Sequence, residues 1–178
     1  MIELVNLNIN DSQEVAFIEK VYMEAFPQSE RRPFELMIDF YSDPQKSFVI
    51  NTIKDDGKAI GLFTYWEFEN FVFGEHFAIA PEARNGGVGA AAMTNFMSSV
   101  DKPIIIEVEL PTTYIADRRI GFYQRLGFRL WDKLAYQQPP YIEGYNPLAM
   151  YLMTWGKIDM NELFPEIKRE IYSSVYGF

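Results

Sequence analysis

Seven consecutive residues have the composition of a phosphate-binding turn: Arg84, Asn85, Gly86, Gly87, Val88, Gly89 and Ala90. Residues 71–80, before this segment, read as a strand, and residues 90–100, after it, read as a helix. A glycine-rich turn that opens a helix leaves several backbone N–H groups unpaired, and the helix dipole adds positive potential at the same place. Arg84 could supply a fixed positive charge. The segment therefore predicts a site for a phosphate or pyrophosphate group.

The spacing of this segment excludes two common phosphate-binding loops. A Walker-type loop would carry a Lys-Ser or Lys-Thr pair after the last glycine, and none follows here. A dinucleotide-binding turn would need a further glycine in register and an acidic residue about 20 positions on. An ordinary strand-to-helix connection remains the alternative, so the interpretation depends on the flanking elements.

Carboxylates on two predicted strands are the second group of candidate residues. Alternation along residues 104–110 places Glu107 and Glu109 on one face and aliphatic side chains on the other. On the preceding strand, Glu75 shares a face with apolar residues. Carboxylates on an otherwise apolar face are costly unless they meet solvent or a partner. They could line a cleft, or they could form a solvated face or structural ion pairs.

The stretch formed by residues 119–128 supplies the strongest sign of a family. It places Tyr123 on a predicted helix that ends before a Gly127-Phe128 pair. Together with the turn at residues 84–90, this order resembles the GNAT superfamily of N-acyltransferases. The acyl-CoA pyrophosphate loop of that family has Arg or Gln, two variable residues, Gly, one residue, then Gly or Ala. The resemblance is good over residues 71–128 and covers the rest of the chain only by the order of elements.

The resemblance implies a role for each candidate residue. Tyr123 would protonate the departing CoA thiolate, Glu107 would be the general base, and Glu75 would bind the acceptor amine. A backbone N–H near Ala78 and Ile79 would polarise the thioester carbonyl. If the glutamate-bearing strands are parallel neighbours, as the family implies, their carboxylates could line one cleft. The alternative for Tyr123 is a core residue on an apolar helical stripe.

Charge and composition exclude several classes of function. The net charge of −9 opposes binding to nucleic acid. Because Cys is absent and His76 is the single His, a metal site is not expected, and the resemblance implies acetyl-CoA as co-substrate without a metal. We expect His76 to be a packed structural residue. No apolar run reaches the ~20 residues that cross a bilayer, and no signal-peptide pattern is present, so we expect a cytoplasmic protein with no membrane partner.

The acceptor and the partners are less constrained by the sequence. The acidic surface would favour a cationic small molecule or a basic peptide, or it only keeps the protein in solution. The resemblance places residues 29–34 near the acceptor pocket. The aromatic loop at residues 136–141 could wall that pocket, pack internally or form an oligomer surface. Trp155, Phe164 and Tyr172 could pack against the sheet or be buried in a homodimer.

We expect one GNAT-like α/β (α+β) domain over residues 1–178, with a mixed central sheet of about six to seven strands flanked by helices and with a C-terminal helix. Strands are predicted at residues 2–8, 47–54, 58–67, 71–80, 104–110, 129–137 and 147–154, and the second and third are predicted to form a hairpin around Asp55-Asp56-Gly57. Helices are predicted at residues 11–26, 29–41, 90–100, 115–126 and 161–173. Asp11, with Glu14 three residues later, resembles a capping box at the start of the first helix, and Pro33 is expected to be tolerated near the start of the second.

The predicted function is transfer of an acetyl group from acetyl-CoA to a primary amine of a small molecule or peptide by direct attack. Two alternatives remain at this point. One is a non-catalytic module of the same fold that senses acyl-CoA or another ligand, and the other is an acyltransferase that uses a longer acyl-CoA. Tyr123 and Glu107 favour the enzyme, because a sensing module would need neither residue.

Overall fold

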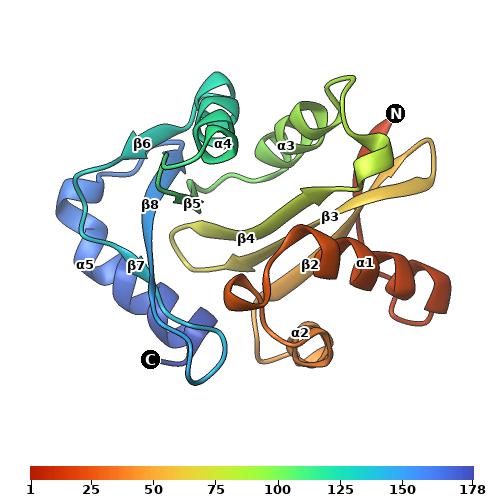
Figure 1. Ribbon diagram of the computed structural model, residues 1–178, viewed down its shortest axis with the longest axis horizontal. Helices are drawn as coiled ribbons and strands as arrows, with labels where there is room; N and C mark the ends of the chain where they lie inside the picture. The colour runs from red at the N-terminus through yellow and green to blue at the C-terminus, as the bar shows by residue number, and fades with distance from the viewer. The chain divides into compact units, whose positions relative to one another are not determined.

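The computed structural model describes residues 1–178 and shows a mixed α/β fold of eight strands and five α-helices (Figure 1). The chain divides into two compact units. The first unit comprises Met1–Glu67 and Gly74–Asp101, and the second comprises Phe68–Phe73 and Lys102–Phe178. The prediction of a single domain over the whole chain stays a prediction. No helix combines the length and the apolar character that a membrane span requires.

The strands of the first unit follow one another in space in chain order. They are β1 (Ile2–Asn6), β2 (Phe48–Asp55), β3 (Lys58–Glu67) and, from Gly74 onward, β4 (Val72–Ile79). The pairs β1–β2 and β2–β3 are antiparallel. Asp56 and Gly57 join β2 to β3 with φ values of 47° and 80°. Two left-handed residues are the signature of a type I′ hairpin turn, so the hairpin predicted around this dipeptide is confirmed.

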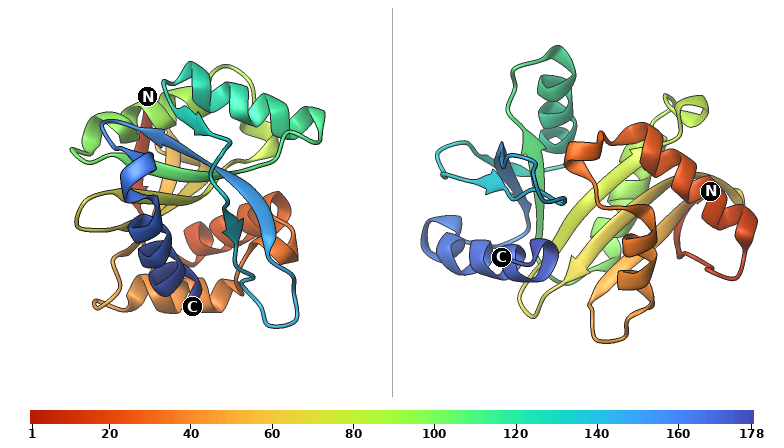
Figure 2. Two further views of the ribbon diagram at one scale, coloured as in Figure 1. Left: turned by 90° about the vertical axis from the view of Figure 1, so that its left-hand side faces the viewer. Right: turned by 60° about the horizontal axis from the view of Figure 1, so that its bottom comes forward.

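Three helices flank these strands, with α1 (Ser12–Ala25) and α2 (Phe34–Ser42) on one face and α3 (Val88–Ser99) on the other (Figures 1 and 2). The Asp11 carboxylate accepts hydrogen bonds from the backbone N–H groups of Gln13 and Glu14, which confirms the predicted N-cap. Aromatic rings of the first unit pack together between strand and helix. The Phe63 and Phe96 centroids, for example, are 4.6 Å apart.

The helix predicted at residues 29–41 is wrong at its start. A short 3₁₀ turn, Gln28–Glu30, is followed by extended backbone, and α2 begins only at Phe34. The physical reason is Pro33, because the residue before a proline avoids the helical region. Arg32 therefore lies in an extended connection, and its side chain enters the protein instead of following a helix surface.

The second unit is built around the long strand β8 (Leu148–Trp155). This strand pairs antiparallel with β5 (Ile104–Glu109), β6 (Arg129–Trp131) and β7 (Gln137–Gln138). The single strand predicted at residues 129–137 is therefore wrong. A turn at residues 132–134, which begins with the polar Asp132-Lys133 pair, interrupts the strand, and β6 and β7 run in the same direction along β8 on either side of it.

Two helices complete the second unit, and they lie on opposite sides of its strands (Figures 1 and 2). The first, α4 (Tyr114–Arg125), starts at Thr113, whose side chain accepts the N–H of Ala116, and it stops before Gly127 at φ 91°. The second, α5 (Met160–Ile171), confirms the C-terminal helix, but a π-helical turn, η3 (Tyr172–Tyr176), follows it. This turn fixes the position of two tyrosine side chains.

Candidate active site

The predicted phosphate-binding turn is a run of three left-handed residues at the start of α3. Asn85, Gly86 and Gly87 have φ values of 77°, 70° and 79°, and Gly87 is the N-cap of the helix. No side chain caps this helix, so its first N–H groups point away from α3 without a side-chain acceptor. A Cβ added at Gly86 or Gly87 would meet nothing within 4 Å. The glycines are therefore required by the backbone conformation, and the space beside them is open.

Gly89, the last glycine of the turn, packs against the protein, unlike Gly86 and Gly87, which lie beside open space. A Cβ at Gly89 would lie 3.7 Å from Cγ1 of Ile79 and 3.8 Å from the Phe77 ring. The Nε–H of Arg84 donates to the Ile79 carbonyl at 2.9 Å, which ties the turn to the end of β4. The use of Arg84 to bind a phosphate group stays a prediction.

The backbone around Ala78 and Ile79 is in close contact with β3. Both residues are buried, and a Cβ built on Gly61 of β3 would lie 2.4 Å from the Ala78 carbonyl oxygen. Only glycine permits this approach between the two strands. Gly61 thus positions the segment predicted to polarise the thioester, and the sequence signal for it is a glycine inside a strand.

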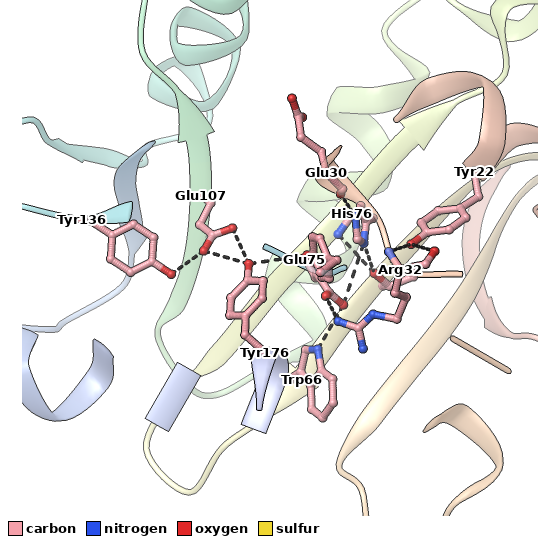
Figure 3. A network of polar contacts seen from close by, with 11 residues as sticks. Tyr22, Glu30, Arg32, Trp66, Glu75, His76, Glu107, Tyr136 and Tyr176 are labelled. Carbon is pink, nitrogen blue, oxygen red and sulfur yellow. Dashed lines mark hydrogen bonds and ion pairs between the residues drawn. The ribbon is translucent and has the colours of Figure 1, made fainter. Parts of the chain in front are cut away.

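Glu107 is hydrogen-bonded by two tyrosines of the second unit (Figure 3). The hydroxyl of Tyr136 donates to Oε1, and the hydroxyl of Tyr176 lies 3.0 Å from Oε1 and 2.8 Å from Oε2. Burial, followed by the charge of Glu107, raises the pKa of Tyr136 well above its usual 10. The predicted base is therefore a carboxylate whose two oxygens both receive phenolic hydrogen bonds.

The other glutamate on this face of β5 has a surface partner. Arg119 of α4 donates to the Glu109 carboxylate, and both side chains are more than one-third exposed, at 46% and 39%. The alternation predicted for β5 is confirmed, because Ile106 and Val108 are buried while the two glutamates are half-buried. The contacts of Glu109 are therefore those of a structural ion pair, which was one of the alternatives for this residue.

Glu75 is held in a buried ion pair in the first unit (Figure 3). Its carboxylate accepts hydrogen bonds from Arg32 and, at 3.0 Å, from the indole N–H of Trp66. The Arg32 guanidinium carbon also lies 4.9 Å from the Phe40 centroid and 5.5 Å from the Phe48 centroid. Only 1% of the Glu75 side chain is exposed, so its contacts are those of a structural ion pair.

His76, which follows Glu75 on the strand, is packed and hydrogen-bonded as predicted. Its Nε2–H donates to the Glu30 carbonyl at 2.9 Å, which leaves Nδ1 facing the Thr64 hydroxyl at 3.4 Å. The Tyr22 ring packs edge-on at 5.0 Å. Burial lowers the pKa of His76 below its usual 6.5, so the ring is neutral at pH 7. These contacts are those of a structural residue.

Tyr123 is buried on α4, between Phe122 and Phe128. The ring centroids are 5.1 Å and 5.3 Å from that of Tyr123. Burial raises the pKa of Tyr123 to about 12, so the phenol stays protonated at neutral pH. The predicted core packing and the predicted donor role are thus compatible, because a buried phenol remains a hydrogen-bond donor.

Two cavities lie away from the predicted site residues. One, of about 740 Å³, lies in the second unit between β8 and α5, and the other, of about 530 Å³, lies in the first unit beside α1. None of the residues predicted to act in the site lines either of them. No cluster of His, Asp or Glu in the structure is arranged to hold a metal ion.

Comparison with known proteins decides the family. The model of the Acetyltransferase (GNAT) family matches residues 10–128, which is more than half of the chain. The chain belongs to the GNAT acetyltransferase family. It is therefore an acyltransferase, and the resemblance, the fold class and the enzyme class expected from the sequence are confirmed.

Solved and curated proteins resemble this one to different degrees. A GNAT-family structure from Bacteroides thetaiotaomicron is 40% identical, covers 99% of both chains and superposes with a TM-score of 0.92. The Bacillus subtilis protein named "Putative acetyltransferase YjbC" is 25% identical over 128 residues, which span 70% of this chain and 65% of that protein. Arabidopsis thaliana Naa50, solved with the bisubstrate analogue CoA-Ac-MVNAL, is 14% identical, covers 88% of this chain and 99% of its own, and has a TM-score of 0.61.

Three residues of this GNAT protein were missed by the sequence patterns. Tyr176 and Arg32 reach glutamates 69 and 43 positions away along the chain, beyond the range of any local pattern. The signal for Tyr176 was its spacing of four residues from Tyr172, which suits one helical face. Gly61 was visible only as a glycine within an apolar strand.

Proposed function

We propose that the protein transfers an acetyl group from acetyl-CoA to a primary amine of a small molecule or peptide by direct attack. The observation that carries this proposal is the turn of three left-handed residues, 85–87, that leads into the uncapped N-terminus of α3. Family membership supports it, as does the CoA-containing bisubstrate analogue bound to the Arabidopsis protein of the same fold.

The residues of the turn fit a pyrophosphate group. The N–H groups of Val88, Gly89 and Ala90 lie in the first turn of α3, where the helix dipole favours an anion. Open space beside Gly86 and Gly87 lets a bulky ligand approach the main chain. Acetyl-CoA supplies an activated thioester carbonyl, and no metal is needed for attack on it.

We propose Glu107 and not Glu75 as the group that takes the proton of the amine. An alkyl amine with a pKa near ~10.4 is protonated at pH 7, and neutralising it costs about 4–5 kcal/mol at 1.36 kcal/mol per pKa unit. Glu107 can accept that proton directly or through a water. Glu75 is already shared between Arg32 and Trp66.

Two further groups of this chain complete the proposed chemistry. A backbone N–H near Ala78 and Ile79 donates to the carbonyl oxygen as negative charge develops on it. When the carbon–sulfur bond breaks, Tyr123 donates its phenolic hydrogen to the departing thiolate. The alkylammonium nitrogen loses two protons in all. It gives one to Glu107 before it attacks, and after the carbon–nitrogen bond has formed it gives the other to the Tyr123 phenolate, so the products are the amide, the CoA thiol and one proton held on Glu107.

The charge of the acceptor is inferred from the net charge of the protein alone. A net charge of −9 favours a cationic amine and opposes nucleic acid as a partner.

The proposed acetyl transfer is tested with acetyl-CoA and a panel of alkyl amines, aryl amines and short peptides, and the release of free thiol is measured for each. The Tyr123→Phe variant should lose about 10²-fold or more in turnover while its affinity for CoA is unchanged. Binding of CoA without thiol release from any amine would instead support a sensing module.

A further inference from the structure

The tyrosines around Glu107 suggest which kind of amine the site accepts. Tyr136 precedes β7 and Tyr176 ends η3, and both donate hydroxyl hydrogen bonds to the carboxylate on β5 (Figure 3). We propose that Tyr176 and Tyr136 are positioning residues that hold Glu107 as the ionised partner of a cationic alkyl amine. This inference rests on the proposed function, because it assigns the acceptor class of that same site.

The π-helical turn explains how the C-terminal segment presents these side chains. Hydrogen bonds from residue i to i+5 widen the turn, so residues four or five apart lie on one side. The Tyr172 and Tyr176 centroids are accordingly 6.4 Å apart. Their hydroxyls have different acceptors, since Tyr172 donates to the Gln137 carbonyl and Tyr176 donates to Glu107. The two residues are thus a natural matched pair for substitution.

The surroundings of Glu107 keep the phenols in their donor form. Three titratable groups near Glu107 in the second unit are Tyr136, Tyr172 and Tyr176. Tyr141 is a neighbour of Tyr176, and their hydroxyl oxygens are 3.5 Å apart. The Lys168 ammonium nitrogen is 5.1 Å from the centroid of the Tyr172 ring. Burial raises the pKa of Tyr136 and of Tyr172 above 10, so both remain protonated at the pH of an assay.

The chemistry of this arrangement selects the acceptor. Hydrogen bonds to a carboxylate stabilise its charged form, and a fixed anion attracts an alkylammonium ion. The ammonium ion then gives one proton to a Glu107 oxygen, and its nitrogen keeps the electron pair that attacks the thioester. An aryl amine is neutral at pH 7 and gains little from the anion. The inferred acceptor is therefore a primary alkyl amine.

Titration of the Glu107 carboxyl group tests the positioning role without any need for turnover. Glutamate labelled at its carboxyl carbon is followed by NMR, and Glu107→Gln identifies the resonance. Removing one donor in Tyr176→Phe should raise the titration midpoint by about one pH unit, which corresponds to about 1.4 kcal/mol. Tyr172→Phe, whose hydroxyl bonds the backbone, should leave the midpoint in place. A midpoint unmoved in Tyr176→Phe, or moved equally in both variants, overturns the inference.

The pH–rate profile separates this inference from the proposed function. With a reactive alkyl amine, the acid limb of the profile should move up by about one pH unit in Tyr176→Phe. An enzyme that acetylates only aryl amines would contradict the inferred acceptor class and leave acetyl transfer intact. If no amine released thiol from the wild-type protein, the proposed function would fail, and the titration would still decide the role of Tyr176.

Discussion

The partner of each glutamate determines whether its carboxylate is available to an amine, and Arg32 and Glu75 are the first example. The pair is buried, with 2% and 1% of the side chains exposed, and aromatic rings enclose the guanidinium. Glu109, by contrast, pairs with Arg119 at the surface. Glu75 and Glu109 thus each have an arginine partner, which is why we propose Glu107 as the group that takes the proton of the amine.

Removal of one partner from the buried pair should destabilise the protein strongly. Arg32→Met leaves the Glu75 charge buried without its cation, and we expect a loss of about 3–5 kcal/mol in the free energy of unfolding. The double variant Arg32→Met/Glu75→Gln should recover part of that loss. Urea unfolding measures both, with Arg119→Met as a surface control expected to cost ~1 kcal/mol or less. Equal losses in Arg32→Met and Arg119→Met would contradict a buried structural pair.

At the scale of elements, short-range rules of chain geometry explain most of the predictions that were confirmed. Asp11 caps α1, the Asp56-Gly57 turn closes the β2–β3 hairpin, and Gly127 ends α4, each through contacts within a few residues. The start of α2 differs from the prediction because Pro33 is the N-cap and not a residue inside the first turn, and it keeps Arg32 out of the helical region. The ion pair of Glu75 and the tyrosine contacts of Glu107 depend on tertiary packing, which local patterns do not contain.

The turn before α3 gives an element-scale prediction for cofactor binding. Gly87→Val forces a branched side chain into a left-handed backbone at φ 79° and obstructs the main chain, so the affinity for CoA should fall at least tenfold. Gly57→Val is the matched control, because Gly57 has φ 80° and equally open surroundings but lies in the β2–β3 turn. Calorimetric titration with CoA measures both variants. Equal affinity in the two would show that the α3 turn does not bind the cofactor.

The contact between β3 and β4 gives a second element-scale prediction. In Gly61→Ala the new Cβ would lie 2.4 Å from the Ala78 carbonyl oxygen, so the strands must separate and we expect a loss of about 1–3 kcal/mol in stability together with lower turnover. Gly121→Ala, in α4, meets only the flexible end of Arg125 at 3.3 Å and should hold or raise stability. Thermal unfolding compares the two. Equal thermal stability of Gly61→Ala and Gly121→Ala would show that the close approach of β3 to β4 does not require glycine at position 61.

At the scale of the whole molecule, buried phenols set the response to alkaline pH. Burial raises the pKa of Tyr65 and of Tyr123 to about 12, and the pKa of Tyr22 and of Tyr136 is raised as well. Unfolded tyrosines ionise near ~10, so between about pH 10 and 12 the unfolded state loses protons that the folded state keeps. The stabilisation is complete below ~10 and is lost as pH rises through the folded values.

The free energy of unfolding should therefore fall steadily across that alkaline window. Each fully buried phenol contributes a slope of up to about 1.4 kcal/mol per pH unit. Tyr123→Phe should make the fall shallower, whereas Tyr114→Phe, which alters a side chain that is 75% exposed, should not. Urea unfolding at a series of pH values measures the slopes. Identical slopes in the wild type and in Tyr123→Phe would contradict the burial of that phenol.

Acetyl transfer to an amine can be measured in a single assay. Free CoA thiol and acetylated amine are quantified in the same reaction of protein, acetyl-CoA and an alkyl amine. The predicted result is one acetylated amine for every thiol released, with both products reduced together in Tyr123→Phe. Thiol release without acetylated amine, or no release with any amine despite CoA binding, would show that the protein does not transfer acetyl groups to amines.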